Sequence, residues 1–251
     1  MRLLWTELKK IRRRHIGLIY AAALLFIFIW TFWAMGEMDE AEIAEQGYYY
    51  LLLCIPLTNA IVLPTILACV ESRLCDIELK GSTFKMLCTM QPRHSIYHMK
   101  LLVSALYLLF FTLAQAALIP LLCCYYRITQ PMPVMHMGIF FFSTFTVSLV
   151  LVILQQSLSL LSQNQLFPLF FGVGGTFIGL FSWFFPNLPI RYFLPWGYYC
   201  VGTTINQFYD EATRTSTFYT IPFPKEIFLG FIIFGILVYL IGKDQFMKKE
   251  V

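Results

Sequence analysis

Few residues in this chain have the type and spacing that chemistry requires. His94 and His98 are four residues apart, which would place both imidazoles on one face of a helix, where they could share a metal ion. His15 and His136 are the other histidines, and His136 is expected on the opposite side of a membrane. We therefore interpret the pair as lying at a headgroup boundary, with metal binding as the less favoured alternative. The sequence has no G-x-S-x-G or H-E-x-x-H motif, so an enzyme is not expected.

The chain also lacks a nucleotide-binding loop. The motif G-x-x-x-x-G-K-[ST] is absent, and the nearest phrase, Gly81 to Lys85, has the wrong spacing. Gly172-x-Gly174 lies inside an apolar segment and joins Gly175-x-x-x-Gly179 in a small-residue pattern that lets helices approach closely. We expect no cofactor in this chain. If the protein pumps, ATP and magnesium must be bound by another polypeptide.

The elements that would position any site are membrane helices. Of the 251 residues 59% are hydrophobic and 13% charged, whereas soluble domains have about 45–50% and about 25%. A helix needs roughly 20 apolar residues to cross a bilayer. Six windows qualify, at residues 16–35, 48–70, 101–126, 138–161, 166–185 and 227–242. We predict an all-α integral membrane protein with one domain over residues 1–251 and six transmembrane helices, although Pro168 and four glycines interrupt the fifth.

The basic residues predict the orientation. Of the 18 lysines and arginines, 14 lie in the N-terminus, the 71–100 loop and the C-terminus, which six spans place on one face. The positive-inside rule makes that face and both termini cytoplasmic. The first outer loop carries an acidic cluster from Glu37 to Glu45, which could attract a cationic peptide or be merely solvated. The net charge of +4 therefore indicates membrane polarity and a lipid surface, with no nucleic-acid partner.

Residues 1–15 are basic, with Leu4, Leu8 and Ile11 at helical spacing and Trp5 beside them. This pattern is typical of a helix lying on the inner leaflet. A topogenic signal with no further role is the alternative.

The spans themselves hold amides and hydroxyls but no ionisable side chain. Ion-coupled carriers need charged groups inside their spans, so the windows argue against ion-driven transport. Gln155 and Gln156 are candidates for lining a substrate pathway. Interhelical hydrogen bonding is the alternative interpretation.

A partner protein could transmit mechanical work to such a protein through the charged 71–100 loop. Gly81 breaks the helix that extends span two, and Ser82 can cap a new one. Phe84, Leu87 and Cys88 then form a short apolar edge before Pro92. This short helix is expected to dock into a soluble partner, although it could instead only anchor the loop at the membrane. The predicted partner-binding residues are Ser82, Thr83, Phe84, Lys85, Leu87 and Cys88.

The outer segment 186–225 is too apolar for a free loop. It contains Trp196, Tyr198 and Tyr199, and we expect it to re-enter the membrane or lie on its outer face. These aromatic residues are candidates for a lid or for contact with a lipid-like substrate.

The chain resembles ABC-2 type permeases, most closely the bacterial lantibiotic-immunity permeases (the LanE/LanG-like group). The resemblance covers the whole chain and rests on the basic N-terminal helix, six spans, the loop sequence ELKGSTFKML followed by QPR, and the outer sequence LPWGYY. It implies that residues Ser82 to Thr89 are the coupling helix that seats in an ATPase subunit. It also implies a dimer of that ATPase, which binds ATP and magnesium, and a second six-span permease or a second copy of this chain.

The same resemblance implies export of amphipathic cationic peptide antibiotics from the plasma membrane of a bacterium. Two alternatives remain. The chain could export another amphipathic or lipid-like substrate, or it could be a non-transporting assembly or sensor subunit.

Overall fold

The computed structural model describes residues 7, 9–11, 14–80, 91–183, 189–210 and 215–249. Most of these residues are helical. The long helices are α2 (Ile16–Gly36), α3 (Glu40–Lys80), α5 (Arg93–Tyr125), α6 (Val134–Leu161) and α10 (Lys225–Lys248), with a shorter α7 (Leu166–Trp183). Each contains one of the predicted apolar windows, apart from one or two end residues of two of them. Helices are expected here because a bilayer forces every backbone polar group to be paired within the segment.

Five of these helices are long and apolar enough to cross a membrane. They are α2, α3, α5, α6 and α10, whose length and composition agree with the prediction. The apolar part of α7, Leu166–Ser182, falls short of that criterion. The prediction of six spans is therefore supported for five segments, and residues 166–183 of the fifth predicted window are helical.

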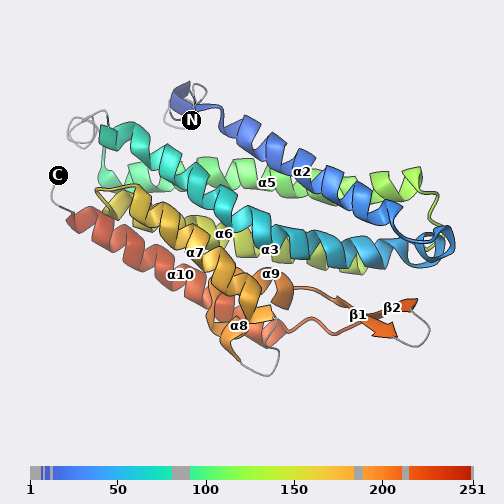
Figure 1. Ribbon diagram of the computed structural model, residues 1–251. Coiled ribbons are helices and arrows are strands. Elements are labelled where there is room, and N and C mark those ends of the chain that lie inside the picture. The colour runs from blue at the N-terminus through green and yellow to red at the C-terminus, as the bar shows by residue number, and fades with distance from the viewer. Residues whose placement is uncertain are drawn as a thin grey trace.

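The helices form one elongated bundle with two distinct ends (Figure 1). We call one end the loop end, because α2 begins there, α3 ends and α5 begins on either side of residues 81–90, and α10 ends. The turns from α2 to α3 and from α5 to α6 lie at the opposite end, which we call the hairpin end. Helix α3 is central and contacts α2, α6 and α7.

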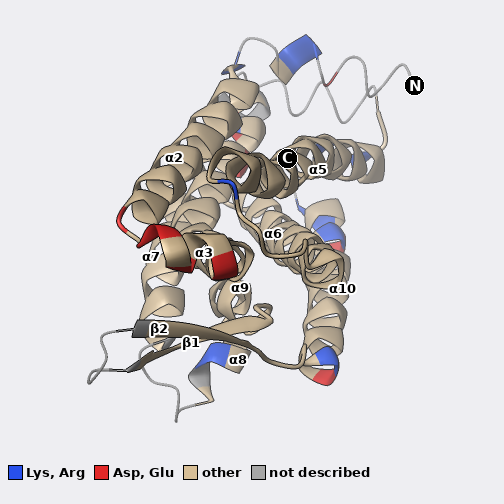
Figure 2. Ribbon diagram, turned by 90° about the vertical axis from the view of Figure 1, so that its right-hand side faces the viewer, with Lys and Arg blue, Asp and Glu red and all other residues tan. Residues whose placement is uncertain are grey.

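Acidic residues gather where α2 turns into α3 (Figure 2). The sequence analysis placed the cluster from Glu37 to Glu45 in a loop, whereas α3 already begins at Glu40. Glu40 and Glu42 lie in its first turn, where carboxylates complement the positive end of the helix dipole. The connection is therefore short, and most of the cluster is part of a helix.

The segment between α7 and α10 is compactly folded. It contains α8 (Ile190–Phe193), η2 (Pro195–Gly197) and α9 (Tyr198–Val201), followed by an antiparallel hairpin of β1 (Ile205–Asp210) and β2 (Thr215–Thr220). The prediction of an entirely helical protein missed these strands. Phe218 fixes the hairpin to α3, because its backbone N–H donates to Gln46 Oε1 at 3.1 Å and its ring packs edge-on against Tyr50.

A reciprocal amide pair joins α3 to α5 inside the bundle. Asn59 Nδ2 donates to Gln115 Oε1 at 3.1 Å, and Gln115 Nε2 donates back to Asn59 Oδ1 at 2.7 Å. Both side chains are buried. Each amide therefore satisfies the other where no water can do so.

We expect Asn59→Leu to destabilise the protein by about 1–2 kcal/mol, because it leaves the buried Gln115 amide unpaired. The double variant Asn59→Leu/Gln115→Leu should recover most of that loss. Thermal unfolding in detergent micelles measures both effects. Equal stability of the single variant and the wild type would contradict the role of this pair.

Candidate functional site

The ends of the predicted coupling loop lie where the sequence placed them. Helix α3 runs to Lys80 and α5 starts at Arg93, so both ends of the loop are at the loop end of the bundle. The predicted partner-binding residues Ser82, Thr83, Phe84, Lys85, Leu87 and Cys88 lie outside the described residues. Their role stays a prediction from the sequence.

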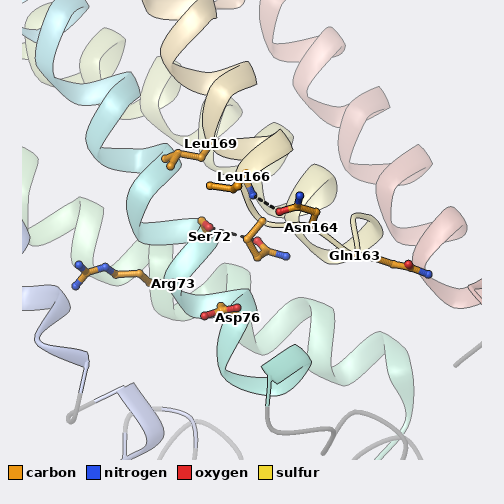
Figure 3. Close-up of a pocket in the computed structure, with 8 residues that line it drawn as sticks. Ser72, Arg73, Asp76, Gln163, Asn164, Leu166 and Leu169 are labelled. Carbon is orange, nitrogen blue, oxygen red and sulfur yellow. Dashed lines mark hydrogen bonds between the residues drawn. The ribbon is translucent and has the colours of Figure 1, made fainter.

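A pocket of about 600 Å³ lies beside this loop, between the last turns of α3 and the turn from α6 to α7 (Figure 3). Its lining residues are Ser72, Arg73, Asp76, Gln163, Asn164, Gln165, Leu166 and Leu169. The Ser72 hydroxyl donates to Gln165 Oε1 at 3.4 Å, and the Asn164 side chain accepts from the Leu166 backbone N–H at 3.0 Å. The wall combines one cation, one anion, amides and two leucines, which suits an amphipathic molecule better than a reaction centre.

Two charged residues at the edges of the apolar windows are buried in the bundle. Glu71 is 0% exposed and Lys100 is 2% exposed. Lys100 Nζ donates to the Leu74 carbonyl at 2.9 Å and lies 4.0 Å from Glu7 Oε2. The predicted apolar windows hold no charged residue, but the charged residues that directly flank two of them were expected in a cytoplasmic loop and are instead buried. Helices α3 and α5 continue past their apolar windows, and Glu7 lies beside Lys100.

Glu71 belongs to a small polar cluster between three helices. Its two carboxylate oxygens, the Ser104 hydroxyl and the Tyr20 hydroxyl are buried without a hydrogen-bond partner within the described part of the chain. Lys100 and Ser104 lie four residues apart on α5, so both are on one face of this helix. The sequence analysis missed this cluster. The signal that could have found it is that Glu71 directly follows one apolar window and Lys100 directly precedes the next.

Gln155 and Gln156 are both buried in hydrogen bonds between helices. Gln155 Nε2 donates to the Pro168 carbonyl of α7, and Gln156 Nε2 donates to the Tyr97 carbonyl of α5 at 2.9 Å. These bonds agree with the alternative interpretation, in which the two glutamines join helices by hydrogen bonds. A role in lining a substrate pathway stays a prediction, and it would require these bonds to open.

Trp196, Tyr198 and Tyr199 are also buried, and each contacts a different helix. Trp196 packs edge-on against Phe171 of α7, with ring centroids 5.3 Å apart. Tyr198 stacks on Phe231 of α10 at 3.9 Å. The Tyr199 hydroxyl bonds the Ser148 hydroxyl of α6 at 2.7 Å. The three residues thus fix the outer segment to the bundle, and their predicted role as a lid remains untested.

The glycines of α7 make room for Trp196. The indole ring occupies the space that a Cβ at Gly175 would need, and a Cβ at Gly179 would lie 2.6 Å from the Trp196 Cβ. The Gly175-x-x-x-Gly179 pattern was expected to let helices approach closely. In this chain these glycines instead leave space for Trp196 of the outer segment.

Other aromatic side chains of the outer segment are exposed. Phe193 of α8 is 82% exposed, and on the hairpin Phe208 is 63% exposed, Tyr209 54% and Tyr219 46%. The sequence favoured Trp196, Tyr198 and Tyr199, whereas these four residues are accessible to a substrate or to lipid headgroups. Burial raises the pKa of the nearby Cys200 thiol to about 12, so this thiol stays protonated at neutral pH.

The described part of the chain gives the histidine pair no third metal ligand. Among the described residues, no group of three or more His, Cys, Asp and Glu side chains could hold a metal ion. His98 instead bonds the Tyr239 hydroxyl of α10 at 3.0 Å, and His136 bonds the Thr204 hydroxyl at 2.8 Å.

Long apolar helices, polar groups paired inside the bundle and charges gathered at its ends define a multi-pass membrane protein. A family model for ABC-2 family transporter proteins matches residues 3–179, which is more than half of the chain. The chain therefore belongs to the ABC-2 family of transporter proteins. No curated protein and no solved structure matches it.

Family membership makes the chain the membrane permease of an ABC transporter, associated with an ABC ATPase. The matched region includes α2, α3, α5, α6 and the loop at residues 81–90, and it ends within α7. The outer segment and α10 lie beyond it.

Proposed function

We propose that this chain is the permease subunit of an ATP-driven exporter that expels lantibiotic-type antimicrobial peptides from the bacterial plasma membrane, for self-immunity or resistance. An ATPase dimer binds ATP and magnesium, and a second permease of six spans or a second copy of this chain completes the pathway. The loop end of the bundle faces the cytoplasm. Residues 82–89 transmit the motion of the ATPase.

The observation that carries this proposal is the position of the loop. The chain has no nucleotide-binding motif, so the energy must come from a partner. Helices α3 and α5 hold the two ends of residues 81–90 at the end of the bundle where α2 begins and α10 ends. A soluble ATPase can reach the loop there without entering the membrane.

Features at both ends of the bundle support an amphipathic substrate. The pocket beside the loop combines Arg73 and Asp76 with Leu166 and Leu169, so it offers a polar wall and an apolar wall to one molecule. At the other end, the first turns of α3 are acidic and the hairpin exposes aromatic side chains. A cationic amphipathic peptide fits both surfaces better than a small hydrophilic solute does.

The coupling helix is tested by Phe84→Asp and Leu87→Asp. We expect each variant to reduce co-purification with the ATPase by at least about tenfold, because a carboxylate would replace an apolar anchor of the contact. Gln91→Asp is the matched control, since it adds the same charge outside residues 82–89 and should bind normally. Normal complex formation and normal peptide resistance in both variants would show that this helix does not couple to the ATPase.

The substrate is tested separately in cells that express the chain with its ATPase. A panel of cationic lantibiotics should be tolerated at higher concentration than in cells with a catalytically inactive ATPase. Protection against uncharged amphipathic compounds alone would favour a different exported substrate. Complex formation without protection against any compound would favour an assembly or sensor subunit.

A further inference from the structure

Arg93, the first residue of α5, ties the exit of the loop to the end of α10. Its Nη1 donates to the Met247 carbonyl at 2.9 Å and to the Lys249 carbonyl at 2.7 Å. The last carbonyls of a helix have no partners within the helix, and a cation there also complements the negative end of the helix dipole. The guanidinium group therefore caps α10 from a different helix.

A second cation extends this connection to α6. Lys249 Nζ donates to the Leu160 carbonyl in the last turn of α6 at 2.8 Å. Burial lowers the pKa of Lys249, which agrees with an ammonium group enclosed between helix ends. The end of α10 thus accepts hydrogen bonds from α5 and donates one to α6.

The same three helices are joined again one to two turns deeper in the bundle. The Tyr97 hydroxyl of α5 bonds the Ser157 hydroxyl of α6 at 2.9 Å. Gly242 of α10 packs so closely that a Cβ there would lie 3.0 Å from the Tyr97 hydroxyl. These contacts, with the bonds of Gln156 and His98, make the loop end of α5, α6 and α10 a densely connected unit.

The entrance to the loop has its own connections to the bundle. Helix α3 is joined to α7 by the bond between the Thr65 and Thr176 hydroxyls at 3.3 Å and by the close approach of Gly172 to Ala68. It also packs along α6 and accepts a hydrogen bond from Lys100 of α5. Motion of the loop can therefore reach α7 through its entrance and α10 through its exit.

We propose that Arg93 and Lys249 are positioning residues for transport, which make α5, α6 and α10 move as one body with the exit of the coupling loop. This inference rests on the proposed function, because the ATPase supplies the motion. Without the two cations, the last turns of α10 and α6 would be joined to α5 only through the contacts one to two turns deeper, so they would follow the start of α5 less closely.

Amide hydrogen exchange tests this transmission in the complex of the full chain with its ATPase in lipid nanodiscs. Exchange is compared with and without a non-hydrolysable ATP analogue at residues 91–100, 155–161 and 243–249. In the wild type we expect the analogue to change exchange at all three. In Arg93→Gln the change at 243–249 should fall by at least about tenfold, the order expected for the loss of even one charge-assisted hydrogen bond, while the change at 91–100 persists.

Three variants separate positioning from simple stabilisation. Arg93→Lys should restore most of the response at 243–249, because an ammonium group can still donate to the carbonyls. Lys249→Gln should reduce the response at 155–161. Lys248→Gln should behave as the wild type, because this neighbouring cation is 70% exposed and pairs with Asp244.

The outcomes distinguish this inference from the proposed function. No change at 91–100 in the wild type would overturn the coupling role of the loop. A change at 91–100 without one at 243–249 in the wild type would overturn the inference alone. An undiminished response at 243–249 in Arg93→Gln, or equal losses at all three regions, would do the same.

Discussion

Replacing Gly175 by leucine is expected to destabilise the protein by about 3 kcal/mol, because α7 has no space for a side chain at this position. The Trp196 indole ring lies where the Cβ would be, and Trp196 is itself buried against Phe171. The substitution should force the indole out and detach the outer segment from α7. Thermal unfolding in detergent micelles measures the loss, and increased tryptophan accessibility to a soluble quencher reports the detachment.

The adjacent residue supplies a matched control. Gly174 has no heavy atom within 4 Å of the position of a Cβ, so Gly174→Leu should change stability by less than about 1 kcal/mol. The double variant Gly175→Leu/Trp196→Ala should lose less stability than the sum of its single variants, since the leucine can enter the space of the indole. Equal losses in the Gly174 and Gly175 variants would contradict the packing of Trp196 against α7.

Replacing Lys100 by methionine should destabilise the protein by about 3–5 kcal/mol, the range for removing one partner of a buried charge arrangement. Lys100 is 2% exposed and donates to the Leu74 carbonyl. Without its ammonium group, the buried Glu71 carboxylate and the buried Glu7 carboxylate lose a nearby positive charge. The free energy of unfolding, measured in detergent micelles, checks this expectation.

A second substitution separates charge from volume in this cluster. Glu71→Gln/Lys100→Met should be more stable than Lys100→Met alone, because the amide removes the unpaired charge and keeps the shape of the side chain. Lys248→Met is the control for loss of a cation from an exposed helix end and should change stability by less than about 0.5 kcal/mol. A double variant less stable than Lys100→Met would contradict the inference that charge drives the loss.

The five long helices were predictable because their apolar windows are long and carry no charge. The end of α3 at Lys80 agrees with the prediction that Gly81 breaks the helix, whereas its start at Glu40 and the burial of Glu71 were not predicted. Those turns contain charged residues, and hydropathy alone ends a span before them. Whether such a turn is buried depends on what packs over it, and here the residue is Glu7, far away in the sequence.

The outer segment was also predicted only in part. Its aromatic content indicated contact with the membrane region, and Trp196, Tyr198 and Tyr199 do pack onto three helices. The hairpin was missed although residues 205–210 and 215–220 are rich in β-branched and aromatic types. In a chain of long apolar helices this short signal was outweighed by the helical context. The partner-binding residues of the loop rest on the sequence alone.

The length of α3 has a consequence for the surrounding lipid. Its 41 residues extend about 60 Å, roughly twice the hydrocarbon thickness of about 30 Å. Helix α3 must therefore continue past the hydrocarbon region, which places its charged turns among headgroups or in water. A thicker bilayer would draw those turns toward the acyl chains, at a cost that grows with the mismatch. The protein should therefore sit most easily in membranes of ordinary or low thickness.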